Sequence, residues 1–436
     1  MKNVSQIAKA MQGILITKAN EVGESSGLIK RERELTGSSF LCGLLFGWLA
    51  NPQASLSDLS QSIGNAGTPL TRQGLAQRFD EAAVTFCRLM LEISLQVLIG
   101  TCKVPQGILS RFTYVILVDS SIITLPNHLH RIWRGSGGFG ENASIASLKL
   151  NVRWDVKNGQ LKVLELSDGT QHDRRSRAHT DPIEAGSLLI EDLGYFKIAD
   201  LARVGEQDAY WLTRYKQGVS VYDLDGNRIK LDQLLPQQVG DRIDCWIRLG
   251  QRDQLLCRLV AERVPQAVVA QRQERIRETA RQNQRPVSVT ALLMAHWTIY
   301  LTNLPMTLCS PDDIFVLGRY RWQIELLFKL WKSDLQVDKW ASQNPHRILC
   351  EIYIKLIGAI VSHWCLLVAC WHNPRRSLRQ AMPTIRGLAW QFANSMANRH
   401  LLNHALQAMC RSLLCCRMDK SRDHPRAFQI IYESIA

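Results

Sequence analysis

Apolar positions in the first hundred residues lie three or four apart, which is the spacing of one face of an α-helix. Two stripes of this kind are Leu41, Leu44, Leu45 and Trp48, and Ala83, Phe86, Cys87, Met90 and Ile93. We therefore expect residues 1–105 to form a helical region.

Between the two stripes the sequence predicts a helix-turn-helix. Asp58–Ile63 predicts a short helix, Gly64–Pro69 a turn, and Thr71 the cap of a second helix. In DNA-binding proteins, Arg and Gln at the exposed start of the second helix contact base edges. The residues in that place are Arg72, Gln73, Gln77 and Arg78. A helical hairpin with a solvated polar face explains the same pattern equally well.

After residue 107 the apolar pattern becomes that of strands. Tyr114–Val118 is a continuous apolar run, typical of a strand buried on both faces, and it ends at Asp119. The alternation over Leu148–Asp155 predicts a half-buried strand, Asn158-Gly159 a hairpin turn, and Leu161–Leu166 the returning strand. These strands indicate a meander at the start of an α/β region.

The α/β pattern continues with a short apolar run, Leu188–Ile190, that ends at the acid pair Glu191-Asp192. A helix and the strand Ala209–Thr213 follow. Residues 215–264 have a purely β pattern, and a polar, arginine-rich helix follows over Gln266–Arg285. This order predicts strands that end in carboxylates, followed by a β-rich segment.

The last part of the chain returns to α/β and then to helices. Trp297–Leu301 predicts a strand, Ile314–Lys332 one long helix, and the remainder to Ala436 further helices. The final segment carries an apolar stripe formed by Leu401, Leu402, Leu406, Met409 and Leu413. The stripe predicts either a dimer contact or packing onto the same chain.

The composition is that of a globular protein, with 46% hydrophobic and 21% charged residues. Lys and Arg number 53 against 39 Asp and Glu, which gives a formal net charge of +14. Such an excess favours a polyanionic partner, most simply nucleic acid. Charge alone does not separate DNA from RNA or an acidic membrane.

Cysteine usage and hydropathy favour a cytoplasmic protein. The 12 cysteines contain no Cys-x-x-Cys pair, which indicates buried, reduced thiols. The N-terminus lacks the apolar core of a secretory signal. Ser39–Ala50 is too short to span a membrane, and Tyr353–Trp371 carries Lys355, Ser362 and His363. We therefore expect core helices and no membrane partner.

Three acidic residues lie where metal-dependent chemistry needs them. Asp119 and Asp192 each follow a buried strand, where a carboxylate is costly unless it is solvated, paired or bound to metal. Glu325 shares one helix face with Arg321 and Lys332. Mg²⁺ binds several carboxylate oxygens, and phosphodiester cleavage uses two metals. A salt-bridged helix and two strand-capping Asp residues fit the spacing as well.

Four segments resemble the DDE transposases of bacterial insertion sequences. They are YVILVDSSIITLP around Asp119, IEDLGYF around Asp192, WTIYLTNLP at 297–305 and RWQIELLFKLWKSD at 321–334. The resemblance implies an α/β fold with a ribonuclease H-like mixed-sheet core, an all-β insertion before the glutamate, and helical regions at both ends. It also implies that Asp119, Asp192 and Glu325 are catalytic and hold Mg²⁺, or Mn²⁺ in its place.

The helix segment resembles the group with the signature Tyr-x2-Arg-x3-Glu-x6-Lys. Arg321, Glu325 and Lys332 fall on the last three signature positions, and the resemblance implies that Arg321 and Lys332 grip DNA. The signature tyrosine falls at Gly318, while Tyr320 stands two residues later, on a different helix face. Tyr320 is therefore the candidate for the tyrosine contact with DNA.

Two tryptophans match aromatic positions of similar enzymes. Trp297 lies in the strand before the signature helix, where relatives stack a tryptophan on a flipped base, and a core tryptophan is the alternative. Trp322 resembles a second aromatic that fills the gap left by that base. For Trp322 we expect packing beneath the helix, because Leu326 and other apolar positions lie near the same side.

The predicted organisation has five parts. These are a DNA-end-binding helical domain (1–105), a catalytic core in two parts (106–213 and 287–375), a β-rich insertion with its linking helix (214–286), and a helical C-terminal region for dimerisation (376–436).

The predicted function is a transposase that binds the terminal inverted repeats of its insertion sequence and cuts and joins double-stranded DNA. The resemblance implies a homodimer in the synaptic complex and a nucleoid-associated protein in a bacterial cytoplasm. The alternative is a catalytically decayed DNA-binding repressor of its own element.

Overall fold

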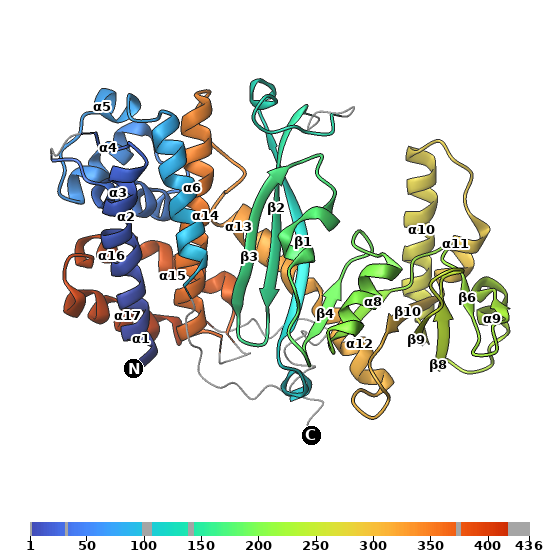
Figure 1. The fold of residues 1–436 in the computed structure, drawn as a ribbon. Coiled ribbons are helices and arrows are strands. Elements are labelled where there is room, and N and C mark those ends of the chain that lie inside the picture. The colour runs from blue at the N-terminus through green and yellow to red at the C-terminus, as the bar shows by residue number, and fades with distance from the viewer. Residues whose placement is uncertain (1, 31–33, 98–106, 138–143, 372–375, 417–436) are drawn as a thin grey trace.

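The computed structural model describes residues 2–30, 34–97, 107–137, 144–371 and 376–416. The predicted domain boundaries at 105 and 375, and residues 417–436 of the predicted C-terminal region, lie outside these ranges. Figure 1 shows helices at one side, a sheet in the middle and a β-rich extension at the other side.

The strands of the described residues form one mixed sheet. They are β1 (Val115–Leu125), β2 (Ala146–Asp155), β3 (Gln160–Asp168), β4 (Leu188–Glu191), β5 (Tyr210–Arg214), β6 (Val221–Tyr222), β7 (Arg228–Ile229), β8 (Arg242–Leu249), β9 (Leu255–Arg263) and β10 (Trp297–Thr302). Their order in the sheet is β3-β2-β1-β4-β5-β10-β9-β8-β6-β7.

The first half of the sheet has the arrangement of a ribonuclease H-like core. β3, β2 and β1 are antiparallel neighbours, and β1, β4 and β5 run parallel. β10 pairs with β5 on one side and with β9 on the other, so the β-rich insertion continues the sheet. The predicted α/β class, mixed-sheet core and terminal helical regions are confirmed.

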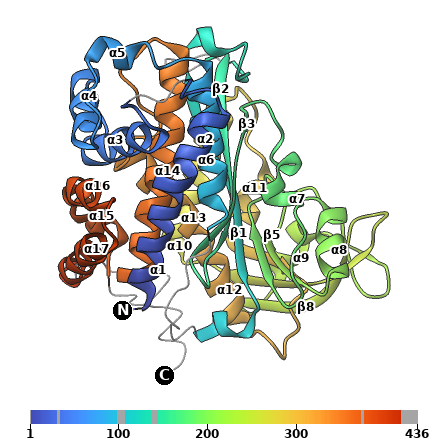
Figure 2. The ribbon, with the colours of Figure 1, turned by 60° about the vertical axis from the view of Figure 1, so that its left-hand side comes forward.

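Helices cover both faces of the core sheet (Figure 2). One face carries α6 (Glu81–Leu95), α13 (Trp322–Ser333) and α14 (Pro345–Ala369), and the other carries α7 (Arg177–Thr180) and α8 (Ile198–Glu206). The side chains of β1 point alternately to the two faces of the sheet. Val115 and Leu117 lie in a first hydrophobic core on one face, and Ile116 and Val118 lie in a second hydrophobic core on the other. Asp119 continues the alternation and points toward α13.

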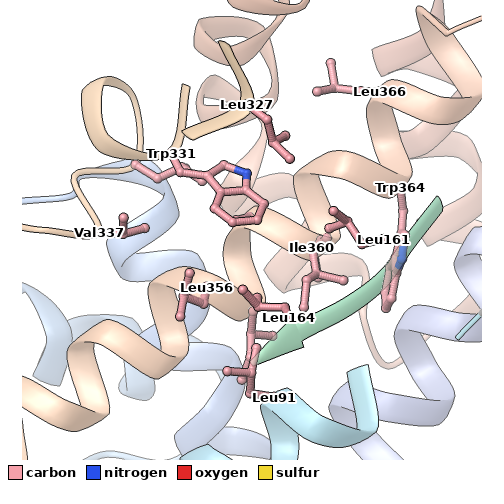
Figure 3. Packing of buried hydrophobic residues seen from close by; sticks show 14 of the residues in the cluster. Leu91, Leu161, Leu164, Leu327, Trp331, Val337, Leu356, Ile360, Trp364 and Leu366 are labelled. Atoms are coloured by element: carbon pink, nitrogen blue, oxygen red, sulfur yellow. The ribbon is translucent and has the colours of Figure 1, made fainter. Parts of the chain in front are cut away.

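Packing beneath α13 fixes that helix in place. Leu327 and Trp331 of α13 belong to the same buried cluster as Leu356 and Ile360 of α14, which Figure 3 shows. All four side chains are buried, and each stabilises the fold by about 1.5–3 kcal/mol. The opposite face of α13, which carries Glu325, points to the edge of the sheet and to solvent.

The N-terminal region contains the predicted helix-turn-helix elements. Its helices are α1 (Lys2–Gln12), the π-helix η1 (Gly13–Lys18), α2 (Ala19–Ser25), α3 (Gly37–Ala50), α4 (Leu56–Asn65), α5 (Arg72–Ala76) and α6. Thr71 Oγ1 accepts a hydrogen bond from Gly74 N at 3.1 Å, so the predicted cap of α5 is confirmed.

The C-terminal helices pack back onto the helical region. They are α15 (Leu378–Gly387), α16 (Ala389–Ser395) and α17 (Arg399–Leu413), and α17 contacts α1 and α14. Leu402, Leu406, Met409 and Leu413 are buried there, whereas Leu401 is exposed. Of the two interpretations of the stripe, the structure shows packing onto the same chain.

Among the described residues, α14 is the helix long and apolar enough to cross a membrane, and 94% of its most apolar 18-residue window is buried inside the protein. Its Lys355 forms an ion pair with Glu351 at 2.7 Å and donates to Lys339 O at 2.7 Å. The helix thus satisfies its buried charges within the fold, as a core helix must. Every cysteine of the described ranges is free.

The remaining helices lie in the first part of the core, in the insertion and in the segment leading to α13. These are η2 (Gly107–Arg111), η3 (Asn127–Leu129), η4 (Asp173–Arg175), α9 (Leu231–Gln237), α10 (Gln266–Gln282), α11 (Val289–Met294) and α12 (Pro311–Tyr320). Because α9 lies within the segment predicted to be purely β, that prediction is wrong there. The predicted single helix over 314–332 is divided at Arg321 into α12 and α13.

Candidate active site

Asp119, Asp192 and Glu325 meet around one guanidinium group. Arg321 Nη1 lies 3.7 Å from Asp119 Oδ2, and Arg321 Nε lies 3.8 Å from Asp192 Oδ1. Arg321 Nη2 also donates a hydrogen bond to Glu325 Oε1. The structure therefore brings together the three acids that the sequence predicts for the site, together with the predicted arginine.

The sheet register explains why the two aspartates are neighbours. β1 and β4 run parallel with Val118 opposite Glu191, so the next residues, Asp119 and Asp192, emerge side by side. β1 continues to Leu125, six residues past Asp119, so the prediction that the strand ends at Asp119 is wrong. The burial on both faces does end there, because β4 stops at Glu191.

The site differs in exposure from one acid to the next. The side chains of Asp119, Glu325 and Asp192 are 18%, 30% and 44% exposed. Burial raises the pKa of Asp119 to about 6, although the hydrogen bond from Ser120 N and the charge of Arg321 oppose the rise. Asp119 is therefore the costliest of the three charges to hold without a cation.

A partly buried ion pair holds the segment beside Asp119. Ser120 Oγ donates to Asp173 Oδ1 at 2.8 Å, and Lys149 Nζ lies 2.9 Å from the same oxygen. Lys149 Nζ also donates to Gln171 O at 2.6 Å. Lys149 occupies a polar position of an alternating strand, which predicts exposure to solvent, so the pattern gave no sign of this contact.

A buried histidine, His179, pairs with the residue that precedes Asp192. His179 Nδ1 is 2.6 Å from Glu191 Oε1, and His179 Nε2 is 3.3 Å from Asp200 Oδ2. Burial acts to lower the pKa of His179, but the two carboxylates outweigh it and raise that pKa. The histidine joins α7, β4 and α8 next to the second aspartate. Nothing in the residue spacing indicates this contact.

Lys332 lies on the outer side of the site. Its Nζ donates to Ile122 O of β1 at 2.8 Å, and burial lowers its pKa. The ammonium is therefore at the end of α13 that adjoins β1, on the same helix as Glu325.

The structure separates the three aromatic candidates. Trp297 is 4% exposed and packs in the second core, where the guanidinium of Arg263 lies 4.8 Å from its ring, so Trp297 is a core residue here. Tyr320 is fully buried, so the prediction that it is placed to contact DNA is wrong. Trp322 is 54% exposed beside the exposed Leu326, and the expectation that it packs beneath the helix is wrong.

The four predicted base readers fall into two groups. Arg72, Gln73 and Gln77 are exposed at and after the start of α5. Arg78 is partly buried, and its Nη1 donates to Leu28 O at 3.5 Å. Three of the four side chains are therefore free to reach a partner, while Arg78 contacts the chain itself.

The donor set of the site suits a hard divalent cation, because it consists of three carboxylates from separate elements. In the conformation of the described residues, no group of three or more His, Cys, Asp or Glu side chains is spaced to hold a metal. The Arg321 guanidinium lies among the acids instead. The residues therefore suit a metal in the type of their donor atoms but not in their spacing in this conformation.

Comparison with known proteins agrees with this chemistry. Residues 110–361 match the family model described as transposase DDE domain. The chain is 29% identical over 363 residues to the transposase for insertion sequence element IS231F of Bacillus thuringiensis subsp. israelensis, covering 78% of this chain and 75% of that protein.

Two further relatives come from other bacteria. The transposase for IS1151 of Clostridium perfringens is 24% identical over 389 residues, which covers 83% of this chain and 80% of that protein. The transposase for IS421 of Escherichia coli is 24% identical over 350 residues, which covers 77% of this chain and 87% of that protein.

Proposed function

The chain belongs to the family of transposases with a DDE domain, and on this premise we propose that it catalyses cut-and-paste transposition of its own insertion sequence. In this proposal the protein binds the terminal inverted repeats, cuts the DNA at their ends and joins the ends to a target. A DDE domain implies the use of a divalent metal, and we assign Mg²⁺, for which Mn²⁺ substitutes.

The observation that carries the proposal is the meeting of three carboxylates at one point of the sheet edge. Asp119 comes from β1, Asp192 from the end of β4, and Glu325 from α13, and all three lie within reach of the Arg321 guanidinium. Carboxylates on three rigid elements are typical of a site that must hold cations in a fixed geometry. A purely structural salt bridge needs only one of them.

In this assignment the three carboxylates bind the metal and the neighbouring cations bind DNA. Two bound Mg²⁺ ions would activate the attacking hydroxyl group and would stabilise the charge on the leaving oxygen. Asp119, Asp192 and Glu325 provide the oxygen ligands. Lys332 lies on the same helix as Glu325, and Arg321 directly precedes that helix. Both cations suit a phosphate next to the cut.

Trp322 is the aromatic best placed to contact DNA. It is exposed, it directly follows Arg321, and it adjoins the acidic site through α13. A base that leaves the helix can stack on such a ring for about 1–3 kcal/mol. Trp297, which is buried, acts in this proposal as support for β10 rather than as a stacking platform.

The N-terminal region is proposed to recognise the transposon ends. The exposed Arg72, Gln73 and Gln77 follow the capped start of α5, as base-reading residues do in a helix-turn-helix. We propose a homodimer in the synaptic complex, with an interface other than the stripe of α17. The proposed location is the bacterial cytoplasm, on the nucleoid.

The alternative function is a decayed transposase that represses its element by binding the ends. The presence and convergence of all three acids favour the enzyme, because a repressor has no use for them. One experiment separates the two. A linear DNA that carries the element's own terminal repeats is incubated with the full chain in two separate reactions, one with Mg²⁺ and one with EDTA. The enzyme cuts the ends only in Mg²⁺, whereas a repressor shifts the DNA and leaves it intact in both buffers.

A further inference from the structure

Arg321 is the sole cation that forms an ion pair with Asp119, Asp192 or Glu325 among the described residues. Its side chain is 13% exposed, so it is largely shielded from solvent. A group of three carboxylates without a cation is unfavourable because the like charges repel. The guanidinium therefore supplies the positive charge that offsets the repulsion among the three carboxylates.

The contacts of Arg321 are unequal. It donates a hydrogen bond to Glu325, one helical turn away on the chain, but its distances to Asp119 and Asp192 are 3.7 and 3.8 Å. At such distances the two aspartates are held by charge and not by a hydrogen bond. Two of the three acids can exchange the guanidinium for another cation without breaking a hydrogen bond.

The oxygens that face Arg321 are also those that a metal needs. Asp119 Oδ2, Asp192 Oδ1 and Glu325 Oε1 are each paired with a different nitrogen of the guanidinium. They are not spaced for a metal while Arg321 lies among them, so metal binding requires the guanidinium to leave and the carboxylates to move together. Two cations in one small site repel each other, so the guanidinium and the metal compete.

We propose that Arg321 is a built-in counter-ion that fills the metal site in the DNA-free protein and is displaced when metal binds. The inference rests on the proposed function, since it takes these three acids as the metal ligands. The released guanidinium presents its planar set of donors to a phosphate, a ligand that suits it well. Metal binding and DNA binding are then linked through one side chain: each favours the state in which Arg321 has left the acids.

The linkage gives a reason for the position of Arg321. It is the single residue between α12 and α13, and its backbone is helical, with φ −49° and ψ −34°. The side chain can therefore change partners by rotation while Glu325 stays fixed on α13. Glu325 pairs with Arg321 in the protein without metal or DNA, and it remains as a metal ligand after the arginine has moved away from the acids.

The test is a Mn²⁺ titration of the full chain without DNA, in which free Mn²⁺ is followed by its electron paramagnetic resonance signal. Arg321→Gln removes the competing charge, so we expect it to bind Mn²⁺ about tenfold more tightly than the wild type. Arg319→Gln is the matched control, because Arg319 is exposed two residues away on α12. It should bind Mn²⁺ as the wild type does.

The opposite result would overturn the inference. If Arg321 merely organises the acids for metal, Arg321→Gln binds Mn²⁺ equally well or more weakly. Thermal unfolding of each variant in EDTA shows that it is folded, and the rise in midpoint on adding Mn²⁺ should be larger for Arg321→Gln than for the wild type. If Arg321→Gln does not fold, Arg321→Lys, which keeps the charge without the planar donors, should bind Mn²⁺ more tightly than the wild type, and equal or weaker binding would overturn the inference.

A double variant separates this inference from the proposed function. Arg321→Gln with Glu325→Gln should lose the tight Mn²⁺ binding of Arg321→Gln alone. If the double variant binds as tightly as the single one, the acids are not the metal site and both proposals fail. If the acids matter and Arg321 does not, the proposed function stands and the counter-ion role is wrong.

Discussion

The ring of Tyr300 in β10 lies so close to Gly318 in α12 that a Cβ atom at position 318 would come within 2.2 Å of Tyr300 Cζ. Both residues are buried, and the Tyr300 ring also packs edge-on against Phe315 at 5.7 Å between centroids. Position 318 is where the resemblance to the Tyr-x2-Arg-x3-Glu-x6-Lys group places the tyrosine. In this chain that position faces the sheet, and the tyrosine that fills the space comes from the strand.

The first prediction concerns this contact. Gly318→Ala should lower the free energy of unfolding by about 1–3 kcal/mol, because the added methyl group must displace the Tyr300 ring or the helix. Gly64→Ala is the control, since that helical glycine has no atom within 4 Å of an added Cβ. It should be neutral or stabilising by up to about 1 kcal/mol. Urea unfolding of both variants checks this, and equal stabilities would show that the contact is not tight.

The second prediction is a stability gain at the active site. Asp119→Asn in metal-free buffer should raise the free energy of unfolding at pH 7.5 by about 2 kcal/mol, because burial raises the pKa of Asp119 to about 6. A carboxyl group whose pKa is raised in the folded protein favours the folded state most when it is protonated. The wild type therefore loses stability as pH rises through 6, and the variant does not.

The check is thermal or denaturant unfolding at pH 7.5 and at pH 4.5. The difference between the two proteins should shrink at the lower pH, where the folded wild-type carboxyl is protonated. Asp225→Asn, at an exposed position, is the control and should change stability by less than about 0.5 kcal/mol at both pH values. A pH-independent gain for Asp119→Asn would contradict the burial of its charge.

The third prediction separates the two tryptophans. Trp297→Ala should cost about 3–5 kcal/mol of stability, because its ring is buried in the second core. Trp322→Ala should leave stability within about 0.5 kcal/mol, because its ring is exposed. In gel-shift assays with cut transposon ends, Trp322→Ala should still weaken binding by about 1–3 kcal/mol. Unchanged binding would remove Trp322 from the proposed DNA contact.

The fourth prediction concerns end recognition. Arg72→Ala, Gln73→Ala and Gln77→Ala should each weaken binding to the terminal repeat by about 1–3 kcal/mol and leave binding to unrelated DNA nearly unchanged. Arg78→Ala should affect end recognition least, because Arg78 contacts Leu28 O of its own chain. Competition binding measures both quantities. A loss that is the same on both DNAs would mean that these residues contact only the backbone.

The sequence predicted the central part of the fold from a few strong local patterns. The apolar run Tyr114–Val118 and the shorter run Leu188–Ile190 each became a buried strand, with the carboxylates Asp119 and Asp192 directly after the doubly buried part. Such patterns are reliable because a strand covered on both faces must be apolar along its whole length. The convergence of the acids, however, depends on strand register, which no single segment encodes.

The errors have a common cause in tertiary packing. β2 alternates as predicted, but its polar positions are buried as well, because α7 and the loop that contains Asp173 cover them. Lys149 then pairs with Asp173, and Arg153 donates to Asp181 O and Pro182 O. Burial of this kind depends on a partner far along the chain. The alternation of apolar and polar residues alone therefore predicts that the polar side chains face solvent.

The exposure of Trp322 was also missed for a tertiary reason. The helix stripe beneath it is filled by Leu327 and Trp331, which pack onto α14, so the face with Trp322 and Leu326 remains open. Helical spacing shows which residues share a face but not which face meets the core. That choice is made by α14, which lies outside the signature segment.

The most direct test of the account is strand cleavage by the full chain after each acid is replaced singly by its amide. Asp119→Asn, Asp192→Asn and Glu325→Gln should each reduce Mg²⁺-dependent cleavage of the terminal repeat by at least about a hundredfold. Each should bind the repeat as tightly as the wild type in a gel-shift assay, since phosphate affinity comes from Lys and Arg. Cleavage within tenfold of the wild-type rate by any one of the three variants would contradict the assignment of that acid, and with it the site.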